Sequence, residues 1–418
     1  MRTLYNLLIH ITSFGLKIVA LFNKKIKLFV DGRRDVFKIL ENKIQLNEKT
    51  IWFHCASLGE YEQGVPIIQA FKKQHPHFKI VVSFFSPSGY ENKKNSTLAD
   101  VIVYLPMDTQ KNAQRFINAV NPTLSIFVKY EIWPNYLFEL KKQNIPTLLI
   151  SGVFRKNQLF FKGYGGFMRN ALFSFNHIFL QDENSEKLLQ SIGFANTTVS
   201  GDTRFDRVSH QIEVDNSLPF VKEFKGESIC IVCGSTWPED EAVLLNYINT
   251  APENVKFIIA PHNIHTEKIA SFAKKLTKKV LLHSKKESVN IALYDVLIID
   301  CIGLLTKLYY YANIAYVGGA MGKTGLHNIL EAATFGVPIV IGKNYQEFPE
   351  AIRLRNLSGL FVVNDAKETA SILSKLVTNK NFREKTGMIA GHFVNQNTGA
   401  TQTVINWINN NLQLSKTS

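Results

Sequence analysis

Two glutamates follow apolar runs in the first half of the chain, where a carboxylate can act on a substrate. Glu60 closes the small-residue turn 54–60, ahead of a helical pattern. A turn of small residues lets a substrate approach the backbone, and a carboxylate there can serve as general base towards an acceptor hydroxyl. A structural role is the alternative, because the helix dipole favours a carboxylate in the first turn of a helix.

The second glutamate, Glu131, lies in the segment 129–135, beside a tryptophan and a proline. It comes at the carboxyl end of a predicted strand, which is where an open α/β sheet places its chemistry. A cation, Arg204, closes the first half of the chain in the segment 201–206 and can face the same site. A surface salt bridge would explain Arg204 as well.

The second half of the chain carries a turn with two alternative interpretations. Ser235 and Thr236 precede a proline and three acids in the segment 234–241, a pattern that caps a helix and needs no ligand. The same strand, glycine and helix start can instead present free backbone N–H groups to a phosphate.

The most informative run of the second half is the segment 325–333. A glycine-rich loop there leads into a helix whose start carries Asn328 and Glu331, so N–H groups can meet a phosphate while an amide or carboxylate meets ribose hydroxyls. His327 fits either a ligand contact or a hydrogen-bonded structural histidine. No metal is expected, because His262 and His265 have no third ligand near them in the sequence.

The candidate residues above can act together only if the ends of several strands lie close to one another. The alternation of short apolar runs with helical patterns predicts a fold of that kind. Strand, crossover helix and strand, repeated, indicate a parallel sheet with helices on both faces. This alternation of strands and helices stops after residue 206 and begins again after residue 226. The predicted fold class is therefore α/β, with two Rossmann-like domains. The predicted strands are 51–55, 79–85, 101–105, 124–128, 147–151, 177–181, 228–233, 255–260, 280–282, 296–300, 314–317, 337–341 and 360–363.

A length of 418 residues also favours two domains. Two such domains facing each other form a crevice at the carboxyl ends of both sheets, where open α/β sheets bind ligands. The expected organisation is a membrane-associated helix and basic segment at 1–44, an acceptor-binding domain at 45–206, a linker at 207–226, a second domain at 227–400 and, at 401–418, a C-terminal helix packing back on the first domain.

Composition narrows the kind of partner and the compartment. The 48 Lys and Arg against 34 Asp and Glu give a formal charge of +14, which favours partners that carry phosphate or carboxylate: nucleic acid, anionic lipid or a phosphorylated small molecule. Four cysteines are too few for a disulfide scaffold and fit a reducing compartment. Cys230 and Cys233 are expected to be buried as small apolar residues, because a strand would point them to opposite faces.

The first 22 residues are mostly apolar, yet their polar residues form one stripe on a helix of period 3.6. This pattern predicts a helix in a membrane interface, with its apolar face among acyl chains and its basic face towards headgroups. A basic cluster between 24 and 34 would add attraction to anionic lipid. A membrane-spanning helix and a helix docked on the protein itself are the alternatives. The stripe consists of Arg2, Asn6, His10, Ser13, Lys17 and Lys24.

Five motifs, in order across nearly the whole chain, together resemble those of the Kdo transferases, which transfer 3-deoxy-D-manno-octulosonic acid. The resemblance implies a GT-B fold, CMP-Kdo as donor, lipid A precursor as acceptor, and an inverting reaction with neither metal nor cofactor. The motifs are the Ser-Leu-Gly-Glu turn ending at Glu60, Leu105-Pro106-Met107-Asp108, Glu131-Ile132-Trp133-Pro134-Asn135, Arg204-Phe205-Asp206 and the Gly-x-His-Asn-x-Leu-Glu run ending at Glu331.

The same resemblance implies roles for individual residues. Glu60 would be the general base, with Glu131 and Arg204 at the transition state. The resemblance places the donor against Pro261, His262, Ile302, Gly303, Leu304, Asn328, Ile329, Leu330 and Glu331, with further donor or acceptor contacts expected from Ser57, Gly59, Arg155, Ser235, Thr236 and His327.

Four positions depart from the family pattern. The family more often has lysine, arginine, glutamate and proline, respectively, where this chain has Arg204, His262, Leu304 and Ile329. Arg204 and His262 still supply a hydrogen-bond donor for phosphate or carboxylate, although arginine can form two parallel hydrogen bonds and lysine cannot. Leu304 would contact CMP only through its backbone.

Two other functions fit parts of the sequence. A UDP-sugar transferase or epimerase would share the fold, although an epimerase needs no lipid contact and leaves the amphipathic amino terminus unexplained. A basic, membrane-associated nucleic-acid binder would use the interleaved aromatic and basic residues of 154–169. No nucleic-acid module accompanies that stretch, which is interpreted as acceptor surface. The expected partners are therefore CMP-Kdo, lipid A precursor and an anionic membrane surface, without nucleic acid, at the cytoplasmic face of the inner membrane.

Overall fold

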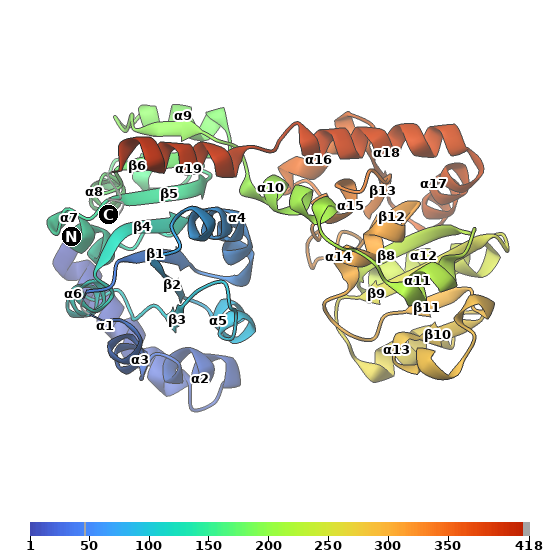
Figure 1. Cartoon of the computed structure of the whole chain (residues 1–418), viewed down its shortest axis with the longest axis horizontal. Coiled ribbons are helices and arrows are strands. Elements are labelled where there is room, and N and C mark those ends of the chain that lie inside the picture. Colours follow the sequence, from blue (N-terminus) through green and yellow to red (C-terminus); the bar gives the residue numbers. More distant parts are fainter. Residues whose placement is uncertain (46, 413–418) are drawn as a thin grey trace. The chain divides into compact units, whose positions relative to one another are not determined.

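The computed structural model describes residues 1–45 and 47–412 and contains two compact units, each built on one seven-stranded sheet (Figure 1). Unit 1 comprises Met1–Arg207 and the chain from Thr398 on, and unit 2 comprises Val208–Asn397. Neighbouring strands run parallel in both sheets. The prediction of two parallel α/β domains is therefore confirmed.

In unit 1 the strand order is β3-β2-β1-β4-β5-β6-β7. The sequence predicted every strand except β7, a short partly exposed strand at the sheet edge that has no apolar run to reveal it. The strands are β1 (Thr50–Cys55), β2 (Lys79–Phe84), β3 (Val101–Tyr104), β4 (Pro122–Val128), β5 (Thr147–Gly152), β6 (His177–Leu180) and β7 (Thr197–Val199).

Helices cover both faces of this sheet, and the last of those before unit 2, α10, extends across the boundary into that unit. They are α1 (Arg2–Val19), α2 (Lys24–Asp31), α3 (Val36–Lys43), α4 (Leu58–Gln74), α5 (Pro87–Lys93), α6 (Gln110–Val120), α7 (Pro134–Lys142), α8 (Gly166–Leu172), α9 (Glu183–Gln190), α10 (Thr203–His210) and α19 (Ala400–Asn411).

In unit 2 the order is β10-β11-β9-β8-β12-β13-β14, and each strand was predicted. The strands are β8 (Ile229–Thr236), β9 (Val255–Pro261), β10 (Val280–Leu282), β11 (Val296–Ile298), β12 (Ile314–Val317), β13 (Ile339–Gly342) and β14 (Leu360–Val363). The helices are α11 (Pro219–Lys225), α12 (Pro238–Thr250), α13 (Thr266–Ala273), α14 (Leu305–Leu308), α15 (Leu330–Ala333), α16 (Pro349–Asn356), α17 (Ala366–Thr378) and α18 (Lys380–Asn395).

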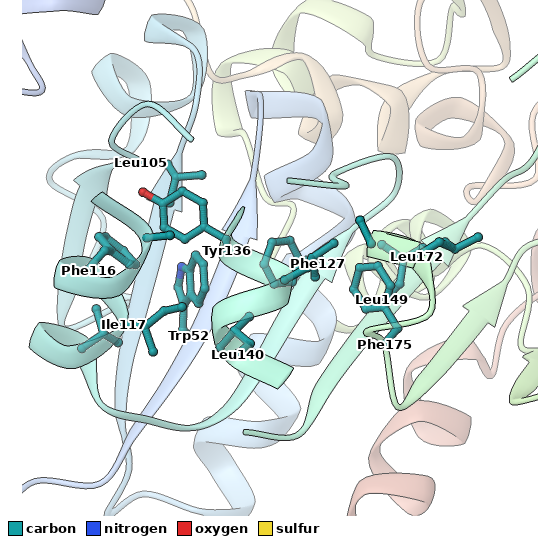
Figure 2. Close-up of a cluster of buried hydrophobic side chains, with 14 of the residues drawn as sticks. Trp52, Leu105, Phe116, Ile117, Phe127, Tyr136, Leu140, Leu149, Leu172 and Phe175 are labelled. Carbon is teal, nitrogen blue, oxygen red and sulfur yellow. The ribbon is translucent and has the colours of Figure 1, made fainter. Parts of the chain in front are cut away.

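The sheet of unit 1 is buried on both faces, which fixes the strands that carry the site. Successive residues of β1 point to opposite faces, so Trp52 joins one core while Ile51 and Phe53 join the other. Figure 2 shows the first core, where the ring of Trp52 lies 5.1 Å from that of Phe127 and 5.8 Å from that of Tyr136. In unit 2, Cys230 and Cys233 of β8 are buried and free, as expected.

Each sheet has one point where the strand order changes direction. In unit 1, β2 lies on one side of β1 and β4 lies on the other. Such a switch point leaves a ligand site outside the carboxyl ends of two adjacent strands. Glu60, in the first turn of α4, follows β1, and Glu131 lies in the loop after β4, so the topology brings the two glutamates to the same sheet edge. The corresponding strands of unit 2 are β8 and β12.

The segment 207–226, predicted as a linker, contains the end of α10 and the whole of α11. Val221 and Phe224 of α11 are buried, and the segment from Val208 on belongs to unit 2. A helix of seven residues spans too few turns for its apolar period to be recognised in the sequence.

Helix α19 packs on unit 1. Its Val404, Ile405 and Ile408 are buried in the same core as Ile51, and Trp407 stacks on His177 with ring centroids 4.6 Å apart.

Helix α1 docks on unit 1 through polar contacts. Tyr5 donates a hydrogen bond to Oδ2 of Asp108 at 2.6 Å, and Asn135 bonds both Asn6, at 2.8 Å, and Arg2, at 3.4 Å. Two members of the polar stripe therefore face the protein, although the stripe was expected to face headgroups. The polar contacts decide this, because they satisfy groups that an apolar docking face could not.

The large apolar side chains of α1 are exposed instead. Those with the most regular spacing are Leu4, Leu7, Ile11, Phe14 and Ile18, which are 49 to 68% exposed. Steps of three, four, three and four residues place them on one face. Within residues 1–45 and 47–412 no helix is long and apolar enough to cross a membrane.

Candidate active site

Glu60 sits at the amino end of α4, in a turn that uses only one of its carboxylate oxygens. The backbone N–H groups of Ala56 and Ser57 both donate to Oε2, the latter at 3.1 Å, within a capping box. Oε1 accepts no hydrogen bond from the described part of the chain. The structural role predicted as the alternative is thus present, and it uses Oε2 alone.

The environment of Glu60 raises its pKa towards neutrality. Burial raises the pKa of Glu60 to about 7, and the charge of Glu131 adds to the rise. The N–H groups of the capping turn and the ammonium of Lys129 oppose it. A carboxylate that titrates near the working pH is matched to general base catalysis.

Glu131 is buried at the end of a chain of side chains that crosses the sheet. Oε2 of Glu131 lies 3.1 Å from Nε2 of His54 and 2.6 Å from the indole nitrogen of Trp133. Nδ1 of His54 lies 2.8 Å from the hydroxyl of Ser83, which accepts the indole N–H of Trp52 at 2.7 Å.

The two indole donors in this chain are fixed. An indole N–H can only donate, so Ser83 accepts from Trp52, and Trp133 donates to Glu131. With its ring proton on Nε2, His54 donates to Glu131; with the proton on Nδ1, it donates to the backbone oxygen of Ser83 at 3.2 Å and its Nε2 accepts from Trp133 at 3.1 Å. In both tautomers the indole of Trp133 orients the carboxylate of Glu131.

Arg204 forms an ion pair, which is the alternative explanation that the sequence left open for it. Its Nε and Nη2 lie 2.8 and 2.7 Å from Oδ2 of the buried Asp202, and its backbone N–H bonds Oδ1 at 2.9 Å. The side chain of Arg204 is 27% exposed, so the guanidinium is oriented at the start of α10 without being buried.

Tyr130 connects these groups. Burial raises its pKa, and its hydroxyl interacts electrostatically with Arg155, Glu60 and Arg204. Charged groups that follow β1, β5 and β7 therefore lie within electrostatic range of one tyrosine. Arg155 is exposed, and its backbone N–H bonds Gln158 at 2.9 Å.

Two small residues leave room in front of Glu60. Ser57 is the N-cap of α4, with its side chain in the capping box. A Cβ added at Gly59 would meet no atom closer than 4.0 Å, so the fold does not demand glycine there. The absent side chain leaves open space beside the base.

In unit 2 the start of α12 forms a helix cap. Thr236 ends β8 and bonds Glu241 at 3.2 Å, and the N-cap is Trp237, one residue after the predicted Ser235 or Thr236. Asp240 accepts the backbone N–H of Trp237 at 2.9 Å. Three acids in the first turn oppose a bound phosphate, which favours the capping interpretation.

Asp240 also joins α12 to the end of β12. Its carboxylate accepts the backbone N–H of Gly319 at 2.8 Å and the hydroxyl of Tyr316 at 2.9 Å. The carboxyl ends of β8 and β12 are thereby held together at the switch point of unit 2.

Three aromatic residues stack at this same edge. The rings of Trp237 and His262 are 4.7 Å apart and nearly parallel, and those of His262 and His327 are 4.4 Å apart. Nε2 of His327 accepts the indole N–H of Trp237 at 3.1 Å. Burial and the neighbouring His262 lower the pKa of His327 to about 4, so it is neutral at pH 7. The interpretation of His327 as a hydrogen-bonded structural histidine is favoured.

The segment 302–304 follows β11 and offers backbone and one exposed side chain. Ile302 is 86% exposed. Gly303 has φ +95°, so any other residue would be strained there, although a Cβ would meet no neighbouring atom. Leu304 is the N-cap of α14. Pro261 ends β9.

The run ending at Glu331 is already hydrogen-bonded within the protein. Oδ1 of Asn328 accepts the N–H of Leu330 at 3.1 Å, and Glu331 accepts from Thr306 at 3.1 Å and from Asn328 at 3.3 Å. Ile329 and Leu330 are buried, so only their backbone can reach a ligand.

Several supporting residues were absent from the predicted site. His54 and Ser83 lie inside strands, and Asp202 directly precedes α10, so nothing in their spacing showed which partner they would meet. A polar residue in a buried strand was the one signal for His54. Among residues 1–45 and 47–412 no three His, Cys, Asp or Glu side chains form a group that could hold a metal ion.

The chain has known relatives over most of its length. Residues 32–207 match the family model described as 3-deoxy-D-manno-octulosonic-acid transferase (kdotransferase). The chain is 28% identical to a 3-deoxy-D-manno-octulosonic acid transferase of Haemophilus influenzae over 85% of each chain. It is 27% identical to the protein of that name from Chlamydophila psittaci, over 71% of this chain and 70% of the relative.

A solved structure shows the same fold at low identity. The UDP-GlcNAc 2-epimerase of Neisseria meningitidis, bound to UDP-GlcNAc, superposes with a TM-score of 0.63 at 14% identity, covering 87% of this chain and 100% of the epimerase. At this identity the likeness concerns the fold alone.

Proposed function

We propose that this chain, which resembles the Kdo transferases over most of its length, is an inverting glycosyltransferase that moves Kdo from CMP-Kdo to a hydroxyl of lipid A precursor in lipopolysaccharide biosynthesis. The observation that carries the proposal is Glu60, whose Oε1 has no hydrogen-bond partner among residues 1–45 and 47–412 and whose pKa is raised to about 7, at the switch point of the domain that matches the Kdo transferase model. The similarity to the Haemophilus influenzae relative over most of both chains supports it.

The reaction proposed is a single displacement. The acceptor hydroxyl gives its proton to Oε1 of Glu60 while its oxygen bonds to the anomeric carbon of Kdo. The bond from that carbon to the phosphate oxygen of CMP breaks, and CMP leaves with the electron pair. Arg204, oriented by Asp202, stabilises negative charge that develops on the donor. The charge of Glu131 adds to the rise that burial gives the pKa of Glu60, and it favours positive charge at the anomeric carbon.

The donor is assigned to the strand ends of unit 2, where the aromatic stack of Trp237, His262 and His327 offers a flat apolar surface to a nucleotide base. Backbone groups of 302–304 and 328–331 supply the remaining contacts. Transfer requires the donor held by unit 2 to reach Glu60 of unit 1.

Purified protein incubated with CMP-Kdo and a bisphosphorylated lipid A precursor is expected to give a product heavier by one or more Kdo residues in mass spectrometry. CMP is expected to raise the melting temperature more than UDP or AMP, because a ligand that binds only the native state stabilises it. Transfer from a UDP-sugar, together with a larger shift by UDP, would contradict the proposal.

We further propose that α1 attaches the enzyme to the cytoplasmic face of the inner membrane, where its lipid acceptor lies. The exposed apolar face of α1 points away from the polar contacts that dock the helix on unit 1. Such a face inserts among acyl chains, and the lysines of α2 add attraction to anionic headgroups.

Changing Ile11 to glutamate is expected to lower binding to vesicles that contain phosphatidylglycerol by about tenfold or more, because a buried isoleucine contributes about 2 kcal/mol. The neighbouring Thr12 is exposed beside the apolar face, so T12E is the matched control and should change binding by less than about threefold. Co-sedimentation measures both variants. If both variants lost vesicle binding equally, the added negative charge alone would explain the loss. Unchanged vesicle binding of I11E would contradict insertion of this face.

A further inference from the structure

A cavity of about 640 Å³ lies where α1, α2 and the segment after β3 meet. This size suits a small-molecule ligand. Its apolar lining comes from Leu16, Ala20, Leu21, Phe29, Val30, Phe37, Pro106 and Met107.

Cations dominate the charge around the cavity. Five cationic side chains line it against one carboxylate, Asp31, which pairs with Arg34 at 2.9 Å. Lys17, Lys27 and Lys111 are exposed and form no ion pair within the described part of the chain. The first turn of α6, which carries Lys111, has no acidic residue. An apolar cavity rimmed by free ammonium groups fits a ligand with an anionic head and an apolar chain.

The fifth cation, Arg33, forms the inner wall. It donates to the backbone oxygens of Leu105, Phe29 and Phe85 at 2.8, 2.6 and 2.6 Å, and its guanidinium lies over the ring of Phe29 at 3.6 Å. No carboxylate within the described residues pairs with it, and burial lowers the pKa of Arg33 to about 9. A buried cation that only carbonyls and rings surround keeps a positive potential in the cavity wall.

A continuous set of contacts links this wall to the glutamates. The guanidinium of Arg33 lies 4.9 Å from the ring centroid of Phe85, whose ring lies 4.5 Å from that of Trp133, the donor to Glu131. The strand β3 that leads to the cavity is two places from β1, or about 10 Å along the sheet edge. One lipid molecule can therefore reach both places.

We propose that this cavity is an acceptor subsite, which binds a phosphate of the acylated acceptor and the acyl chain next to it while the acceptor hydroxyl reaches Glu60. The proposal rests on the proposed transfer to a lipid. None of Leu4, Leu7, Ile11, Phe14 and Ile18 lines the cavity, but the exposed Leu21 after α1 does, and the acyl chain leaves the cavity past this side chain. The three lysines hold the phosphate as point charges.

The charge test compares two triple variants that each remove three positive charges. The cavity variant is Lys17→Gln, Lys27→Gln and Lys111→Gln, and the control is Lys38→Gln, Lys43→Gln and Lys73→Gln, exposed residues of unit 1 outside the cavity lining. Initial rates are measured in nonionic detergent micelles without phospholipid. The acceptors are bisphosphorylated lipid A precursor and its dephosphorylated form.

The cavity variant is expected to raise the KM for the bisphosphorylated acceptor at least about tenfold, with kcat, the KM for CMP-Kdo and the KM for the dephosphorylated acceptor unchanged. The control should stay within about twofold. Equal KM changes in the two triple variants would overturn the proposal. A difference in KM between the two variants that appears only when phosphatidylglycerol is added would also overturn it, because the occupant of the cavity would then be a bilayer lipid. Wild-type protein that transfers nothing to either acceptor would instead contradict the proposed function.

The apolar part of the subsite is tested by filling it. Ala20 lines the cavity and is 9% exposed, whereas its neighbour Val19 is 47% exposed and lies outside the lining. Ala20→Phe is expected to lower kcat/KM at least about fivefold for the tetra-acylated acceptor and less for one with short chains, while Val19→Phe changes neither. An unchanged melting temperature shows that A20F is folded. Equal effects on long-chain and short-chain acceptors would contradict the acyl-chain assignment.

Discussion

Replacing Glu60 by glutamine is expected to lower kcat by about 10³-fold or more, while the affinity for CMP stays within a few-fold. The amide oxygen of glutamine can still accept the N–H groups of Ala56 and Ser57, so the turn and the start of α4 are kept. An amide cannot take the proton of the acceptor hydroxyl. The loss should therefore fall on kcat, measured with both substrates saturating, and leave the melting temperature close to that of the wild type.

The matched control for this variant is Glu62→Gln. Glu62 lies two residues away on the same helix and pairs with Lys93 at 3.0 Å and Arg207 at 2.8 Å, outside the capping turn. Its neutralisation should reduce kcat less than about threefold. Transfer by E60Q at near the wild-type rate would remove Glu60 from the mechanism.

The second large effect is expected for Glu131→Gln, which should lower kcat/KM about 100-fold and shift its pH dependence. Glu60 acts as a base only when ionised, so the activity of the wild type should rise with pH through about 7. The charge of Glu131 contributes to that raised pKa. Its removal lowers the pKa of Glu60, and the acidic limb of the pH profile moves to lower pH.

The control for this variant is Glu139→Gln. Glu139 is also buried and follows the same strand, but it bonds Gln143 at 2.9 Å on α7 and does not contact Glu60. This variant should keep the acidic limb of the wild type. A limb that stays in place in E131Q would show that Glu131 does not set the pKa of the base.

The sequence predicted the sheets more completely than the side-chain contacts, for a physical reason. Strands buried on both faces read as continuous apolar runs, so β1 and β4 could be recognised, and their order in a Rossmann-like sheet brings Glu60 and Glu131 to one edge. The chain from Trp52 through Ser83 and His54 depends on which side chains face each other across strands. Neither composition nor spacing contains that information.

The contacts of the amino-terminal helix could not be predicted from the sequence either. Periodicity predicted that α1 is amphipathic, but it could not tell which face meets the protein. Contacts of Tyr5 and Asn6 with Asp108 and Asn135, more than 100 residues away in the chain, decide the orientation. Similarly, the ion pair of Arg204 with Asp202 was only one of two alternatives until its distances were known.

The path of the chain through unit 1 has a consequence for biosynthesis. Unit 2 is one continuous segment, Val208–Asn397, and contains all its strands when its own residues have left the ribosome. Unit 1 lacks α19 until residues 400–411 are made, and its core around Ile51 then receives Val404, Ile405 and Ile408. During translation the earlier-made unit therefore keeps an uncovered apolar surface while the later-made one can close, so the first half of the chain is the part that needs chaperone protection longest.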